Sequence, residues 1–473
     1  MTVATATGPV ATVDVAHEAS VRRIGQRIDG VDLRVVAGAP LRLAIFAGRE
    51  PEQLAAARAI ALGACADVVL VLVADTRASF VDLAASLRDA RPDAVLIVAD
   101  AGDVNGVIDL VEALRAGCAG QPTPPALLAA ADERVRERIA ASAAPLHVEA
   151  IPGPLGAQAR DAIVARLRGI RRGGDDVVLR DEAIESAARA LSAATARTTL
   201  VVDVSGASTS LALATESGAL LAAHSHLGVG SGADRIVARA GLDRVRRWIP
   251  RAIDAPALLE RVFNRARWPD AIPPGALTLA IEMSLAREAI AQLLREAERA
   301  GIAVASLRSA AAIVCTGTLA GFPRAAQTVI AAIDAIGPDG TLLVSRERPD
   351  ALVAAGAVGA HPSADVMATL VPLALVATVW PRRPSTVTVT DGTGTIEKRV
   401  ARGSFVLIPT RGAVDVRVAG VTERVAAESL ALGVVIDARG RPIDLPLRDA
   451  ERLPALGRWY AALATLPVEE ATP

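Results

Sequence analysis

The sequence is poor in lysine, aromatic residues and cysteine, and each shortage excludes a kind of site. Lys398 is the single lysine, although Lys and Arg together number 51. Away from Lys398, the chain therefore has no lysine to clamp a phosphate in a Walker A loop or to form a Schiff base. With 2% aromatic residues, it offers little surface on which nucleic-acid bases could stack.

The three cysteines, Cys65, Cys118 and Cys315, lie far apart and form no CxxC pair, so neither a disulfide framework nor a zinc site is indicated. The formal net charge is −1, and we expect no basic surface for nucleic acid. The first residues lack the basic-then-apolar order of a signal peptide. The apolar run 366–380 is shorter than the roughly 20 residues that span a bilayer, and a buried helix or strand is expected there. We therefore expect a cytoplasmic protein that binds neither nucleic acid nor membrane.

Apolar runs alternate with helical patterns through the first half of the chain. Residues 1–40 are weakly patterned, and we expect them to be weakly ordered. Continuous apolar strands separated by helices then indicate a parallel sheet covered on both faces. Residues 41–195 are therefore predicted to form a doubly wound α/β unit with two following helices. The strands expected in this unit are 41–48, 68–75, 94–100, 126–131 and 147–151.

A second α/β region is predicted at 196–380, with long helices near 281–300 and 324–336. From residue 381 the apolar residues alternate with period two, which is typical of half-buried strands, around an Asp391-Gly392 turn. Residues 381–473 are therefore predicted to form a small β domain with a terminal helix.

The segment Val201 to Gly218 holds the sharpest local motif. An apolar strand ends in an acidic residue, and a turn of small residues follows before a second strand. Backbone N–H groups of such a turn can approach phosphate oxygens closely, while the carboxylate can hold a metal or its waters. This makes Asp203 a candidate metal ligand. The candidate nucleotide-binding residues are Asp203, Ser205, Gly206, Ser208 and Thr209. An ordinary β-hairpin with a polar turn would read the same way.

A second strand-turn-helix pattern spans Ala311 to Pro323. Its turn contains Gly317 and Thr318, which we take as further nucleotide-binding candidates, although a purely structural turn has the same pattern.

The serial order of several segments resembles the glutamate mutase L family of the actin/Hsp70-like ATPase superfamily. In order, the segments are Ser225 to Gly228, Trp248 to Pro250, Asn264 to Pro269, and Leu285 to Ala289. They stand where that family has Gly-Asp-Leu-Gly, Trp-Leu-Pro, Asn-Lys-x-x-x-Pro and Ala-x-x-Ala-Arg-Glu-Ala elements. The resemblance covers about residues 41 to 460.

The resemblance implies an actin-like, ribonuclease H-like core with an inserted doubly wound α/β unit and a small C-terminal β domain. It also implies a phosphate loop at Asp203 and an adenosine contact at Gly317. Its function would be that of an accessory protein, a nucleotide-linked chaperone or reactivator of an adenosylcobalamin-dependent mutase, with mutase subunits as partners.

The chain departs from the superfamily at its nucleotide site. The first phosphate loop is absent from residues 1–40, Ser205 and Ser210 replace a Gly and an Asp, and His226 stands where the family has Asp. We therefore expect Mg-ATP to bind weakly and turnover to be negligible, leaving at most residual ATPase activity. A pseudo-ATPase scaffold without catalysis, and a small-molecule kinase of the superfamily, are the alternatives.

Other candidate residues are less informative. We expect His224 and His226 in a polar loop, and Glu282 and Glu288 at solvated helix positions. Arg246, Arg247 and Arg251 are expected to form surface ion pairs. The doubly wound unit lacks the Asp-x-His-x-x-Gly loop of cobalamin domains, so we expect no cobalamin to be bound directly.

Overall fold

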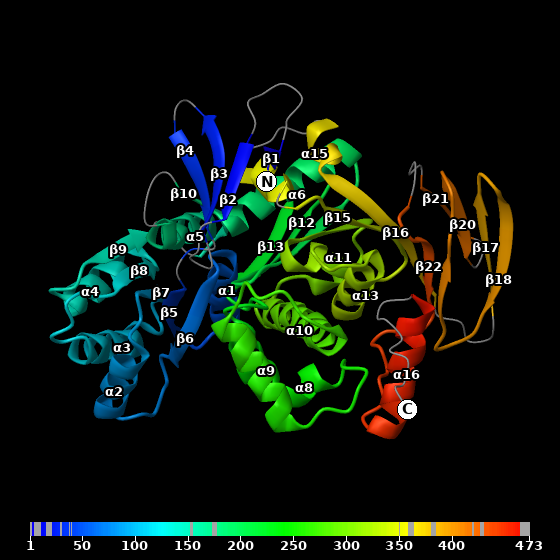
Figure 1. The fold of residues 1–473 in the computed structure, drawn as a ribbon. Helices are drawn as coiled ribbons and strands as arrows, with labels where there is room; N and C mark the ends of the chain where they lie inside the picture. The colour runs from blue at the N-terminus through cyan, green and yellow to red at the C-terminus, as the bar shows by residue number, and fades with distance from the viewer. Residues whose placement is uncertain are drawn as a thin grey trace.

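The computed structural model describes residues 2–3, 11–15, 21–28, 31–36, 38, 40–151, 155–172, 177–349, 351–357, 364–379, 385–418, 421–425 and 430–463. Across these residues the fold is mixed α/β, with parallel strands and covering helices (Figure 1). No described helix is long and apolar enough to cross a bilayer.

The N-terminal strands form a five-stranded sheet of their own. Its order is β1-β2-β3-β4-β10, where β10 is Val177–Leu179. The other strands are β1 (Thr2–Val3), β2 (Ala11–Val15), β3 (Val21–Ile28) and β4 (Val31–Val36). The expectation that residues 1–40 are weakly ordered falls partly on residues outside the described part of the chain.

A parallel sheet of order β6-β5-β7-β8-β9 forms the first large unit. Side chains alternate across it, so Ile45 packs with α1 and α5 while Phe46 packs with α2, α3 and α4. The predicted parallel sheet with helices on both faces is thus confirmed. Its elements are β5 (Leu41–Ala47), β6 (Ala66–Val73), β7 (Ala94–Val98), β8 (Ala126–Ala130), β9 (Val148–Ile151), α1 (Pro51–Gly63), α2 (Phe80–Ala90), α3 (Val104–Gly117), α4 (Glu133–Ala143) and α5 (Ala157–Arg172).

An eight-stranded sheet forms the centre of the second unit, with the order β13-β12-β11-β14-β15-β16-β22-β19. Strands β11, β14 and β15 are parallel, whereas β12 and β13 return as an antiparallel meander. The strands are β11 (Thr199–Val204), β12 (Thr209–Ala214), β13 (Leu220–Ser225), β14 (Ala312–Thr316), β15 (Thr341–Glu347), β16 (Leu370–Thr378), β19 (Phe405–Ile408) and β22 (Gly433–Asp437). The apolar run at 366–380 is therefore largely a buried strand.

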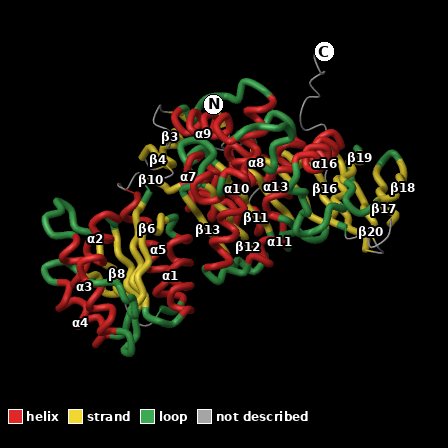
Figure 2. Tube along the Cα trace, turned by 90° about the horizontal axis from the view of Figure 1, so that it is seen from below, coloured by secondary structure: helices red, strands yellow, loops and turns green. Residues whose placement is uncertain are grey.

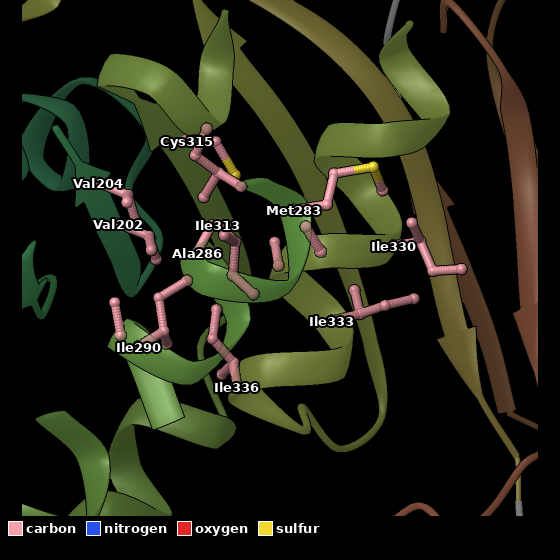
Figure 3. Packing of buried hydrophobic residues seen from close by; sticks show 14 of the residues in the cluster. Val202, Val204, Met283, Ala286, Ile290, Ile313, Cys315, Ile330, Ile333 and Ile336 are labelled. Carbon is pink, nitrogen blue, oxygen red and sulfur yellow. The ribbon is translucent and has the colours of Figure 1, made fainter. Parts of the chain in front are cut away.

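Helices cover both faces of the central sheet. One face carries the large aliphatic core, in which Val202 and Ile313 from the sheet meet Ile290 of α10 and Ile333 of α13 (Figure 3). The opposite face is covered at one end by α6 (Arg180–Thr195), α14 (Ala351–Ala357) and α15 (Ala364–Ala368). The helices of the first face are α7 (Ala233–Ala240), α8 (Leu242–Arg246), α9 (Ala255–Arg267), α10 (Ala276–Arg299), α11 (Val304–Arg308), α12 (Gly317–Ala320), α13 (Ala325–Ile336) and α16 (Asp449–Ala462).

The C-terminal segment is divided between two sheets. A four-stranded antiparallel sheet of order β18-β17-β20-β21 packs on the central sheet beside β16 and β22 (Figure 1). Its strands are β17 (Ser385–Asp391), β18 (Gly394–Val400), β20 (Val414–Val418) and β21 (Val421–Val425). In contrast, β19, β22 and α16 belong to the central sheet and its core. Residues 381–473 are therefore integrated with the preceding region, although the predicted boundary itself lies outside the described residues.

Polar contacts add to this integration. The Tyr460 hydroxyl donates to the Trp248 carbonyl at 2.9 Å, and the Arg452 guanidinium donates to the carbonyls of Arg246 and Arg247 at 2.8 Å. Core residues of α16 belong to the face of the central sheet that carries α10 and α13, and Figure 2 shows α16 near β19.

Limited proteolysis should cut first near Pro381 to Pro384, where the period-two alternation of apolar residues begins in the sequence. The two pieces should stay together after the cut. Strand β22 pairs with β16 across the cut, and the α16 core contacts bury apolar area on both pieces. We expect the nicked chain to elute as one species in native size-exclusion chromatography and as two in denaturant. Release of a soluble C-terminal piece without denaturant would contradict the integrated fold.

Candidate functional site

The two predicted loops meet at the carboxyl ends of neighbouring parallel strands. Strand β11 ends beside β14, and a bridge between Val204 and Gly317 extends their pairing. The Thr316 hydroxyl donates to Asp203 Oδ1 at 2.5 Å. The carboxyl edge of parallel strands is where open α/β sheets place their ligands. The residues brought together here are Asp203, Ser205, Gly206, Ser208, Thr209, Gly317 and Thr318.

Arg180 occupies the position next to the candidate metal ligand. Its Nε and Nη2 donate to the two carboxylate oxygens of Asp203 at 2.8 and 2.7 Å. Both side chains are buried, at 7% and 0% exposure. Burial alone would lower the pKa of Arg180, but the Asp203 carboxylate raises it overall. With Thr316 as a third donor, both oxygens of Asp203 have partners within the protein.

Glu347 completes the cluster from the end of β15. Its Oε1 accepts from the Gly317 N–H at 2.9 Å, and its Oε2 accepts from the Leu352 N–H at 3.1 Å. Burial raises the pKa of this carboxyl to about 7, against the opposing effect of Arg180. One guanidinium therefore lies among two acidic side chains at the edge of three adjacent parallel strands.

Three backbone donors in the turn of small residues, the N–H groups of Ser205, Ala207 and Ser208, are bound within the turn itself. The hydroxyl oxygen of Ser205 accepts from the N–H groups of Ala207 and Ser208 at 3.3 and 3.0 Å. The Ser205 N–H donates to the Ser208 carbonyl at 2.8 Å. Donors that a phosphate would need are thus bound internally.

A glycine-containing loop lies against the same turn. A Cβ on Gly228 would lie 2.4 Å from the Ala207 nitrogen, so any side chain there would force the two backbones apart. The Gly230 N–H donates to the Gly206 carbonyl at 2.9 Å, and the Thr209 hydroxyl donates to the Leu227 carbonyl at 2.6 Å. The segment Ser225 to Gly228 therefore packs directly on the predicted phosphate loop.

Gly317 faces the same constraint on the other loop. Its φ is +65°, a region that favours glycine, and a Cβ would lie 2.5 Å from the Val204 carbonyl oxygen. A second glycine is not needed there, because Thr318 enters the short helix α12.

The arrangement does not fit a divalent metal at Asp203. Its two oxygens are held by Arg180 and Thr316, and across the described residues no group of three His, Cys, Asp or Glu side chains could hold a metal ion. The sequence patterns did not indicate Arg180 or Glu347 as members of this site. Glu347 ends an apolar strand and could have been noticed, whereas Arg180 carries no local signal.

The expectation that Glu282 and Glu288 occupy solvated helix positions is wrong. Glu282 and Glu288 are buried on α10, where Glu282 pairs with Arg265 at 2.8 Å and Glu288 accepts from the Trp248 indole at 3.1 Å. A charge on a helix amid apolar residues needs a partner, and each glutamate has one.

The histidines also differ from the expected polar loop. His224 lies on buried β13 and its Nε2 is 2.9 Å from Glu185 on α6. His226 is 7% exposed. The arginines at 246 and 247 do form ion pairs, with Asp243 and Glu288.

At the carboxyl edge of the β5–β9 sheet, Arg49 pairs with the buried Asp103 at 2.7 Å.

The comparisons with known proteins yield one distant structural similarity. No protein family matches the chain, and no curated protein matches it. Among solved structures it is similar to component A of (R)-2-hydroxyglutaryl-CoA dehydratase from Acidaminococcus fermentans. That likeness has 13% identity and a TM-score of 0.23, and covers 56% of this chain and 85% of the other. A similarity of this size does not indicate a function.

Removing one partner of the buried pair should be costly. We expect Arg180→Ala to lower the free energy of unfolding by roughly 3–5 kcal/mol, because Asp203 would keep a buried charge without its cation. Urea denaturation followed by circular dichroism measures this free energy of unfolding. Arg189→Ala on the exposed side of the same helix is the matched control and should change it by less than about 0.5 kcal/mol. Equal effects of the two substitutions would contradict the pair's role.

Stability should also fall in acid because of His226. Burial, with Arg171 and Arg235 nearby, lowers its pKa from 6.5 to about 4. The unfolded chain therefore takes up a proton that the folded chain does not. This contribution to stability is complete above pH 6.5 and is lost as pH falls toward 4.

We expect wild type to lose about 3 kcal/mol more than His226→Gln between pH 7 and pH 4. Urea unfolding at several pH values measures this difference. His147→Gln, at an exposed position, is the control and should follow wild type. If the free energies of unfolding of wild type and His226→Gln fall in parallel as the pH is lowered, His226 is not held neutral in the folded chain.

Proposed function

We propose that this chain is a pseudo-ATPase of the actin-like, ribonuclease H-like type that acts as an accessory or scaffold protein. The observation that supports this proposal most strongly is the buried Arg180–Asp203 pair. Phosphoryl transfer depends on metal ions that neutralise and position the phosphates. Here a fixed guanidinium holds the carboxylate that would bind such an ion.

The strand arrangement supports the fold part of the proposal. An antiparallel meander β13-β12-β11 is continued by parallel β14 and β15, and the two candidate loops follow β11 and β14. A nucleotide loop in this fold would lie at the same turn. In this chain the Ser205 hydroxyl uses the turn's N–H groups and the Gly228 loop packs against it, so the turn serves as a packing junction.

The mutase-related part of the proposal rests on the order of sequence segments that resemble glutamate mutase L. In the fold, residues within or beside these segments contact one another: Trp248 donates to Glu288, and Arg265 donates to Glu282 and to the Val229 carbonyl. The proposed partner is therefore an adenosylcobalamin-dependent mutase subunit, with the chain as its chaperone or scaffold. Affinity capture from the source cells with mass spectrometry tests this partner.

Calorimetry with Mg-ATP tests the nucleotide part. We expect wild type to bind Mg-ATP with a dissociation constant of about 1 mM or weaker, corresponding to roughly 4 kcal/mol. Asp203→Ala should behave the same, because the carboxylate is already engaged by Arg180. Phosphate release should stay at the level of the buffer.

Arg180→Gln is the companion variant. It removes the guanidinium from Asp203, so that Oδ2 is freed while Oδ1 keeps the Thr316 hydroxyl, and it leaves a polar side chain at position 180. Tight Mg-ATP binding by wild type that Asp203→Ala abolishes, together with steady phosphate release, would overturn the pseudo-ATPase proposal and indicate an active reactivating ATPase.

A further inference from the structure

A cavity of about 450 Å³ lies between the parallel-sheet unit and the second unit. Its walls come from α1 and β6 on one side and from α7 and α10 on the other. This volume is within the range of small-molecule sites, which occur preferentially between domains. Its lining residues are Arg58, Ala61, Leu62, Ala66, Val68, Val71, Arg239, Glu296 and Arg299. None of them belongs to the Asp203 cluster.

The charges in the cavity are unbalanced toward positive. Arg239 pairs with Asp67 and, at 3.3 Å, with Glu296, so the acidic group in the lining already has a cation. Arg58 and Arg299 have no hydrogen-bond or ion-pair partner among the described residues. Two guanidinium groups are therefore left to meet an anion.

The remaining wall is aliphatic. Ala61 and Leu62 come from the last turns of α1, while Val68 and Val71 come from β6, the edge strand of its sheet. Such a surface favours a hydrocarbon group, because removing apolar area from water stabilises the complex by about 25 cal/mol per Å².

We infer that this cavity binds a small amphipathic anion, with a carboxylate or phosphate head at Arg58 and Arg299 and a hydrocarbon body against Leu62 and Val68. An inorganic anion would leave the aliphatic wall uncovered, and a neutral hydrocarbon would leave both arginines without a partner. Arginine forms paired hydrogen bonds with carboxylate and phosphate alike, so the head group is defined only by that shared chemistry.

Occupation of the cavity would also join the two units. Arg58 belongs to the first unit and Arg299 to the second, so an anion held by both would link the two units. The inference does not depend on the proposed function, because the cavity lining shares no residue with the Asp203 site.

Calorimetry and thermal unfolding with the full chain test the inference. The probes are octanoate and octyl phosphate, with 1-octanol as the neutral probe and inorganic phosphate as the head group alone. We expect octanoate or octyl phosphate to bind wild type at least tenfold more tightly than 1-octanol or inorganic phosphate, and to raise the melting temperature. The tighter of the two identifies the head group.

Arg58→Gln with Arg299→Gln should weaken binding of the better probe by roughly tenfold or more. Arg261→Gln, on an exposed arginine of α9 without a described partner, is the matched control and should leave it unchanged. The melting temperatures without probe should match, because the replaced side chains have no protein partner to lose. Absence of binding by wild type, equal binding of 1-octanol or of phosphate, or equal weakening by Arg261→Gln would each overturn the inference.

Discussion

The buried ion pair between Arg180 and Asp203 is the interaction around which the centre of the molecule is arranged. It joins the first residue of α6 to the end of β11, and through Thr316 and Glu347 it reaches the ends of β14 and β15. A carboxylate at the edge of a sheet must be neutralised when it is buried. In this chain the Arg180 guanidinium supplies that neutralisation. The edge is thereby closed by protein groups.

The same solution recurs across the core, where other buried carboxylates are also neutralised by buried arginines. Arg439 is buried between Asp334 and Asp437, at 2.7 and 2.8 Å, and lies over the Phe405 ring at 4.2 Å. Arg287 pairs with the other carboxylate oxygen of Asp334 at 2.9 Å. A planar guanidinium can serve two carboxylates and an aromatic face at once, which a lysine ammonium cannot do with comparable geometry. This network ties β22 and the C-terminal segment to α10 and α13.

A second network joins the parallel-sheet unit to the central sheet. Arg168 and Arg171 on α5 donate to the carbonyls of Gly63 and Ala64 at the end of α1, and pair with Glu185 and Asp181 on α6. His224 on β13 contacts Glu185 as well. The pKa of Glu185 is lowered to about 2 because His224 and Arg168 outweigh the effect of burial. The contact between the units thus includes a buried polar network, together with Leu62 of α1, which joins the apolar core of the second unit. Leu62 also lines the cavity.

The sequence by itself determined the parallel sheet and its covering helices. Residues 41–151 carry strong local patterns of apolar strands and helices, and those patterns depend on neighbours in the chain. It also placed the two loops at Asp203 and Gly317, since each follows an apolar strand. The tertiary structure alone decided what surrounds them. Arg180 and Glu347 lie 23 and 144 residues from Asp203, and their approach depends on strand order and helix packing. For the same reason Glu282, Glu288 and His224 seemed solvated: their partners are distant in sequence, and burial is a property of the packed fold.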